Sequence, residues 1–67
     1  MSVARVTEFS ARSERSFQDA IDEGIARANK TLRNVKGAWI KEQHVEVSDG
    51  RVVAYRVNLL VTFVLDD

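Results

Sequence analysis

An Asp49-Gly50 pair between two runs of β-type residues constrains the fold more than any other feature of the chain. Asp-Gly is typical of the two central positions of a type I′ turn, which joins adjacent antiparallel strands. After the pair, every odd position from Val53 to Leu65 is apolar. Because strand side chains alternate between two faces, one face of this strand is continuously apolar and must be covered. We therefore predict a hairpin with strands at residues 38–47 and 51–65.

The residues before this hairpin have helical periodicity. Ser13 and Ser16 are alternative N-caps, and Lys36 with Gly37 fits a helix C-terminus. Gly24 in the helix interior costs about 1 kcal/mol relative to Ala, so we expect it to mark a close approach to a strand. Apolar or small residues recur every three or four positions and form the stripe that should face the sheet: Phe17, Ile21, Gly24, Ile25, Ala28, Leu32 and Val35.

A first β-type run, from Val3 to Phe9, completes the order strand, helix, strand, strand. The expected fold class is α+β (β-α-β-β), a three-stranded antiparallel sheet wrapped on one helix. No linker, repeat or low-complexity segment divides the chain, so residues 1–67 are interpreted as a single domain.

The chain has 67 residues and no cysteine, which predicts self-association. A core this small is marginal alone, and the lack of cysteine excludes disulfides and thiolate zinc sites as supplements. The expected helix of about 23 residues spans about 35 Å, whereas a strand of about 15 residues spans about 50 Å. The strand ends should therefore project, and the face of the sheet opposite the helix should be covered by other copies.

Charge and hydropathy exclude several classes of function. The formal net charge is zero, which argues against a general binder of nucleic acid. No apolar run approaches the roughly 20 residues of a membrane span, so no membrane partner is expected. The first residues, Met1 to Arg5, lack the pattern of a secretory signal. We expect a cytoplasmic protein.

Catalytic and metal-binding residues are scarce. His44, the only histidine, shares a strand face with Glu42 and Glu46. This arrangement offers an acid–base pair or a metal ligand, but a partly exposed histidine in a hydrogen-bond network is the favoured interpretation. We predict no catalytic residue and no metal site, and do not expect an enzyme. Three carboxylates within one helical turn are interpreted as a solvated helix face: Asp19, Asp22 and Glu23.

Trp39 is the most informative single residue. If Asp49 and Gly50 form the whole loop, Trp39 lies opposite Leu60 on the face away from the helix. The same register puts Lys41 opposite Asn58 and Gln43 opposite Arg56 on that face. An exposed Trp there is either an anchor between subunits or a stacking platform for a flat ligand. Arg56 has two corresponding interpretations: an ion pair across an interface, or a contact to a ligand's carbonyl or phosphate oxygens.

The chain resembles the dodecin family over essentially its whole length. The resemblance rests on the element order and on strings that co-occur at the right spacing: Ser13-Glu14, Ala20-Ile21, Ala26-Arg27-Ala28, Lys30-Thr31-Leu32-Arg33, Lys41-Glu42 and Val61-Thr62-Phe63. It implies a dodecin-like fold assembled as a hollow homododecamer. It also implies flavins stacked in pairs between aromatic side chains at subunit contacts, stored or sequestered without turnover.

Two family positions differ in this chain. The resemblance puts the family's stacking Trp at Gly37 and its flavin-binding Gln at Arg56, so an amide has become a donor-only cation. Trp39 lies two residues further along, on the same strand face as Gly37. The first hypothesis is flavin (FMN or riboflavin) binding, with Trp39 stacking and polar contacts from Arg56, Gln43 and Lys41. The alternative is a dodecin-like shell without flavin that binds calcium-type ions or is purely structural.

Overall fold

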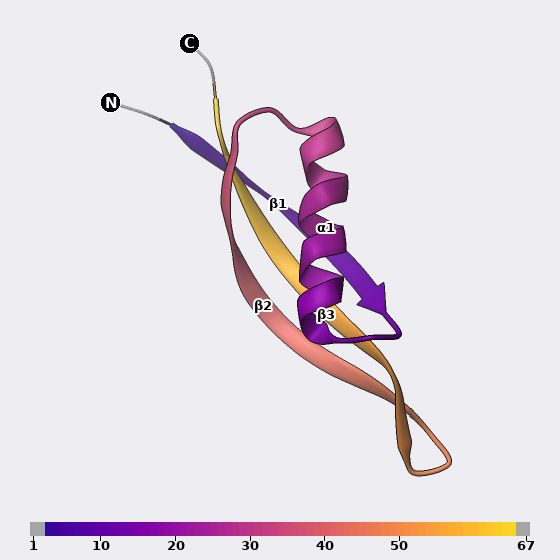
Figure 1. The fold of residues 1–67 in the computed structure, drawn as a ribbon. Helices are drawn as coiled ribbons and strands as arrows, with labels where there is room; N and C mark the ends of the chain where they lie inside the picture. Colours follow the sequence, from indigo (N-terminus) through magenta and orange to yellow (C-terminus); the bar gives the residue numbers. More distant parts are fainter. Residues whose placement is uncertain (1–2, 66–67) are drawn as a thin grey trace.

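The computed structural model describes residues 3–65, which form one sheet and one helix. The elements are β1 (Ala4–Ser13), α1 (Phe17–Thr31), β2 (Val35–Ser48) and β3 (Arg51–Val64). The sheet is antiparallel with strand order β1-β3-β2, and α1 lies on one of its faces (Figure 1). The predicted α+β class and β-α-β-β order are confirmed.

β1 is longer than predicted. Its pairing with β3 is uninterrupted from Ala4, opposite Val64, to Ser13, opposite Tyr55. The sequence prediction ended this strand at Phe9, because the residues that follow lack β-branched or aromatic side chains. Pairing along the full length of β3 overrides that weak local preference.

The helix begins at the second of the two predicted caps. The Ser16 hydroxyl accepts a hydrogen bond of 2.9 Å from the Asp19 backbone N–H. Ser13 instead ends β1, where its buried hydroxyl donates to the Asp19 carboxylate at 2.7 Å and accepts from the Arg15 N–H at 2.9 Å. The cap and the strand end are thus tied together at Asp19, which fixes where the chain turns from sheet to helix.

The predicted C-terminus of the helix, at Lys36 and Gly37, is wrong. The helix ends at Thr31, and Asn34 adopts a left-handed conformation with φ 59°. Asn tolerates this conformation better than other residues with side chains, so the reversal needs no glycine. Lys36 and Gly37 therefore belong to β2.

The hairpin turn forms as predicted, because Asp49 and Gly50 both have positive φ, at 52° and 75°. The register of the hairpin agrees with the prediction at its two ends only. Trp39 lies opposite Leu60, as predicted. Lys41 of β2 and Val53 of β3 are each an extra residue without a partner, and the pairs between these two β-bulges are shifted by one residue.

The predicted pairs Lys41–Asn58 and Gln43–Arg56 are wrong because of these two β-bulges. Glu42 pairs with Asn58 instead, and His44 pairs with Arg56. A third irregularity leaves Lys36 as an extra residue near the start of β2. Because a shift of one residue exchanges the two faces of a strand, the middle of β2 presents even-numbered side chains on the face away from α1.

The core lies between α1 and the middle of β3. Val57, Leu59 and Val61 are fully buried there, together with Ala20 and Ala28 of the helix. The predicted stripe is confirmed within the helix, where Phe17, Ile21 and Ile25 pack on this cluster. Its last two members, Leu32 and Val35, also pack on the cluster, but they lie beyond the helix, and Val35 belongs to β2. The hairpin extends well past the beginning of α1 (Figure 1), and residues beyond the helix are exposed, as Val47 is to 61%.

Gly24 is where the helix approaches the sheet most closely. A Cβ atom at this position would lie 2.6 Å from Leu59 Cδ1 and 3.2 Å from Ala11 Cβ. Leu59 is fully buried, so its side chain has little room to move away. The glycine is thus required by packing, as its cost in a helix interior predicts.

We predict that Gly24→Ala lowers the free energy of unfolding by about 1 kcal/mol, because overpacking of about 1–3 kcal/mol exceeds the gain in helix propensity of about 1 kcal/mol. Urea denaturation at fixed protein concentration measures the change. Ala26→Gly, at an exposed helix position, is the matched control for propensity alone. If Gly24→Ala stabilises the protein by as much as Ala26→Gly destabilises it, the close approach is not a steric constraint.

Candidate ligand-binding face

The face of the sheet that α1 does not cover, called the open face below, mixes apolar and polar side chains. From the central strand it carries the even-numbered residues of β3: Arg56, Asn58, Leu60, Thr62 and Val64. Leu60, Thr62 and Val64 are only half-buried, and Val6 of β1 is exposed beside them. Within one chain, this apolar surface has no covering layer.

Trp39 is the most prominent residue of the open face. It lies on β2 opposite Leu60 and is 64% exposed. A hollow of about 310 Å³ adjoins it, lined by Lys36, Gly37, Ala38, Trp39 and Thr62. Gly37 contributes no side chain to this hollow, and no atom lies within 4 Å of the place its Cβ would occupy. The indole and the hollow together offer room for a flat group beside an aromatic ring.

Lys41 reaches the same end of the open face from its β-bulge. Its Nζ lies 3.4 Å from Oε1 of Glu8, a β1 residue opposite Leu60. The Lys41 ammonium therefore reaches Glu8, which pairs with Leu60 from β1 as Trp39 does from β2. The Lys41 side chain is half-exposed, and its positive charge is partly neutralised by Glu8.

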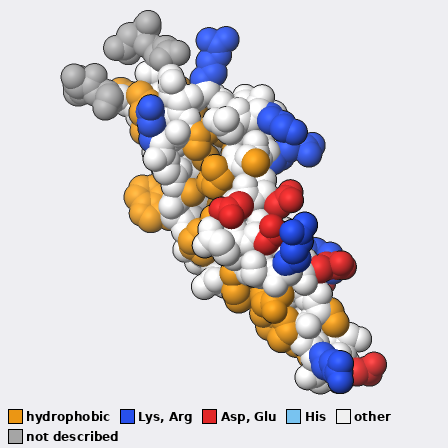
Figure 2. Space-filling view, viewed as in Figure 1, with side chains coloured by type: hydrophobic (Ala, Val, Ile, Leu, Met, Phe, Trp, Pro, Cys, Tyr) orange, Lys and Arg blue, Asp and Glu red, His pale blue; other side chains and the backbone are white. Residues whose placement is uncertain are grey.

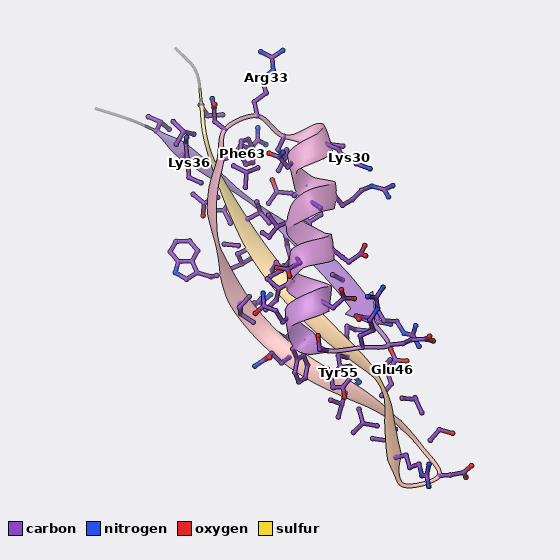
Figure 3. All side chains as sticks on the ribbon, in the orientation of Figure 1. Lys30, Arg33, Lys36, Glu46, Tyr55 and Phe63 are labelled. Carbon is purple, nitrogen blue, oxygen red and sulfur yellow. The ribbon has the colours of Figure 1, made fainter. Side chains whose placement is uncertain are left out.

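Further along the open face, Glu46 joins the three strands electrostatically. Its carboxylate accepts from Arg12 Nε of β1 at 3.1 Å and from Arg56 of β3 at 3.0 Å. Hydrogen bonds from these guanidinium groups, reinforced by their charge, hold the pKa of Glu46 below its usual value. The hydrogen bond to Glu46 and the charge of that carboxylate, with a smaller contribution from Glu14, raise the pKa of Arg12. Figure 3 shows Glu46 near the beginning of α1, where the hairpin leaves the helix.

A second hollow, of about 260 Å³, lies between this network and Trp39. It is lined by Glu42, Gln43, His44, Arg56 and Asn58, and Asn58 donates a 2.8 Å hydrogen bond to Glu42. The alternation that placed Glu42, His44 and Glu46 on one face is confirmed by the observed pairs. Within residues 3–65, however, no three His, Asp or Glu side chains come together as a metal site.

The structure brings together only part of the predicted site. Trp39 pairs with Leu60, and the Lys41 ammonium reaches Glu8 on the other side of Leu60. Arg56 lies four residues further along β3, about 13 Å from Leu60. Gln43 pairs with Val57 and lines the second hollow together with Arg56, away from Trp39. Within one chain, the four residues do not surround a common point.

Sequence reasoning missed three participants: Glu46 as the partner of Arg56, and Lys36 and Thr62 beside Trp39. Thr62 could have been found, since it alternates with Leu60 and Val64 on the predicted open face. The Arg56–Glu46 contact depends on the shifted register, which local sequence does not indicate.

A helix on one face of a three-stranded antiparallel sheet defines a class of small α+β proteins, and comparisons place the chain more narrowly. A family model described as Dodecin matches residues 3–66. The chain therefore belongs to the dodecin family, whose members are small binding proteins. No curated protein sequence gives a significant match. The helix of the described residues is neither long nor apolar enough to cross a membrane.

Solved structures support the same placement. The tt0972 protein from Thermus thermophilus is 33% identical with a TM-score of 0.93, covering 100% of this chain and 98% of its own. Dodecin from Streptomyces davaonensis is 32% identical with a TM-score of 0.91, and the match covers 98% and 97% of the two chains. Calcium dodecin from Mycobacterium tuberculosis is 29% identical with a TM-score of 0.81, covering 97% and 93%.

We predict that Arg12→Gln and Arg56→Gln each raise the pKa of Glu46, because each removes a hydrogen bond and a positive charge from its carboxylate. An NMR titration of the side-chain carboxyl carbon measures the shift. Since the pKa is lowered by folding, the stabilising contribution of Glu46 is present above the ordinary Glu pKa of about 4.3 and is lost as the pH falls through its lowered value. Lys30→Gln, on the helix, should leave the titration unchanged. A Glu46 midpoint insensitive to both arginine variants would refute the network.

Proposed function

We propose that this chain is a non-enzymatic flavin-binding protein that stores or sequesters FMN or riboflavin in the cytoplasm. It acts as a hollow homododecamer with the flavin held at contacts between copies. The exposed Trp39 indole, beside a hollow on an otherwise uncovered sheet face, carries the proposal. Membership of the dodecin family and the apolar open face support it.

Trp39 is the stacking residue in this proposal, because its indole is large, flat and accessible. Lys41, whose ammonium reaches Glu8 across β3, supplies a polar contact from the same chain. Arg56 and Gln43 line a different hollow from Trp39 and so do not share its ligand within one chain. We assign them to a ligand held against a neighbouring copy, where a site built from two chains combines distant residues.

A second candidate function is a shell without flavin that binds calcium-type ions or is purely structural. Two observations favour it: Gly37 has no side chain where the family's stacking Trp is expected, and Arg56 is already engaged by Glu46. One similar structure is described as a calcium-chelating dodecin. In this case Trp39 packs between copies and makes no ligand contact.

We predict that the purified protein quenches flavin fluorescence at micromolar concentrations, because stacking on an indole quenches the excited flavin. Trp39→Ala should weaken flavin binding at least about fivefold, since stacking of a flat ring on an aromatic side chain contributes about 1–3 kcal/mol. Fluorescence titration with riboflavin and FMN measures both effects. Val47→Ala, which truncates a similarly exposed side chain at the hairpin tip, is the matched control.

Sedimentation of the same variants separates the two functions. A Trp39→Ala protein that stays assembled but loses flavin supports the stacking role. Unquenched flavin with the unmodified protein contradicts the flavin proposal. If Trp39→Ala then dissociates the assembly, or calorimetry detects calcium binding, the shell without flavin is the better description.

A further inference from the structure

The helix leaves part of its own side of the sheet uncovered. α1 packs mainly against β1 and β3, so β2 lies to one side of it (Figure 1). Ile40 of β2 pairs with Leu59, which is completely buried, yet Ile40 itself is 41% exposed. A large apolar side chain is therefore left in contact with water directly beside the core.

A groove between α1 and β2 contains this isoleucine. Its volume is about 350 Å³, which is larger than that of either hollow of the open face. Ile21 and Ile25 line the groove from the helix, and Val35, Ala38 and Ile40 line it from β2. Lys36 is the one charged residue of the lining. The groove is thus suited to apolar side chains and carries a single positive charge.

The tip of the β2–β3 hairpin has exposed apolar side chains of its own. Val47, Val52 and Val53 are between 44% and 61% exposed, and Val47 pairs with Val52 across the hairpin. Figure 2 shows hydrophobic side chains beyond the beginning of α1, and others between α1 and β2, in a single view. Apolar groups at both places are therefore accessible from the side of the molecule that bears the helix.

The tip cannot reach the groove of its own chain. Val47 follows Ile40 by seven residues on the same extended strand, which separates them by about 20 Å. The molecule measures 52 × 19 × 13 Å, so the hairpin does not fold back on itself. Each of the two apolar surfaces can therefore be buried only by another molecule, and burial of both is favourable.

Charge favours a second copy of this chain as that molecule. Residues 24–41, which include the β2 side of the groove, contain five cations and no carboxylate. Residues 42–51, which lead to the tip and form its turn, contain three carboxylates and one cation. The groove and the hairpin are thus complementary in charge as well as apolar, and such complementarity selects the partner and its orientation.

We infer that the hairpin tip of one copy docks in the groove between α1 and β2 of a second copy. The valines of the tip pack against the isoleucines of the groove, and Asp49 of the turn lies toward Lys36. Because the two surfaces differ, a copy can donate its tip to one neighbour and receive the tip of another, and such contacts can close into a ring. The inference goes beyond the proposed flavin function, because this contact lies on the side of the sheet that bears α1.

Introduced cysteines test the contact directly, because the chain has no cysteine of its own. Val52→Cys and Ala38→Cys place one thiol at the tip and one in the groove, more than about 20 Å apart in one chain. Under mild oxidation this double variant should form disulfide-linked multimers on a non-reducing gel, since the bond needs Cα atoms within about 7 Å. Val52→Cys with Ala26→Cys, an exposed helix position outside the groove lining, is the matched control and should remain unlinked.

Charge substitutions provide a second measurement. Val52→Asp at the tip and Ile40→Asp in the groove should each raise the dissociation constant between copies at least about tenfold in sedimentation velocity, because a carboxylate would be buried among apolar groups. The two variants refolded together should recover part of the association, since each supplies the surface that the other lacks. Ala26→Asp should leave association unchanged. Truncation of a single valine, as in Val47→Ala, leaves two valines at the tip and retains most of the contact.

The outcomes separate this contact from the flavin function. Equal linking of both cysteine pairs would refute the inference, and so would an assembled protein in which the tip and groove cysteines stay unlinked. An unmodified protein that sediments as a monomer would also refute it. If the tip and groove cysteines link while no flavin binds, the contact is supported and only the flavin proposal fails.

Discussion

The structure depends on the contact between α1 and the central strand of the sheet. Val57, Leu59 and Val61 of β3 are fully buried only because the helix comes down onto them, and Gly24 permits that approach. A single helix can cover one face of the sheet over part of its length. The open face and the projecting hairpin follow from this limit. The exposed apolar surface of the sheet is therefore a direct result of how the core is built.

The open face divides into two chemically different regions. Around Trp39 it is aromatic, partly apolar and bordered by Lys36, whose charge is not neutralised by a nearby carboxylate of the described residues. Around Glu46 it is a network of paired charges that ties β1, β2 and β3 together. The ligand site that we propose lies in the first region. The second holds the strands in place, because its hydrogen-bonding groups already have partners.

Much of the fold was predictable, since it is encoded locally. Asp49-Gly50 fixed the turn, the alternation along β3 fixed its buried face, and the pairing of Trp39 with Leu60 followed from both. The helix end was not predictable from Gly37, because Asn34 reverses the chain earlier. The β-bulges were not predictable either, because an extra residue in a strand is selected by pairing with the neighbouring strand. They pair Gln43 with Val57 and leave Arg56 opposite His44.

The positions of the lysines in β2 have a consequence for how copies of this chain can meet. β2 is an edge strand, and its pairing with β3 is interrupted at two extra residues of β2, Lys36 and Lys41. Each of these two interruptions therefore carries a charged side chain. Bulges and edge lysines prevent a sheet from continuing into the sheet of another molecule. The bulges and lysines of β2 thereby work against open-ended growth of the sheet through its backbone. In the proposed assembly, contacts between copies would be made by side chains, which allows the assembly to close at a finite size.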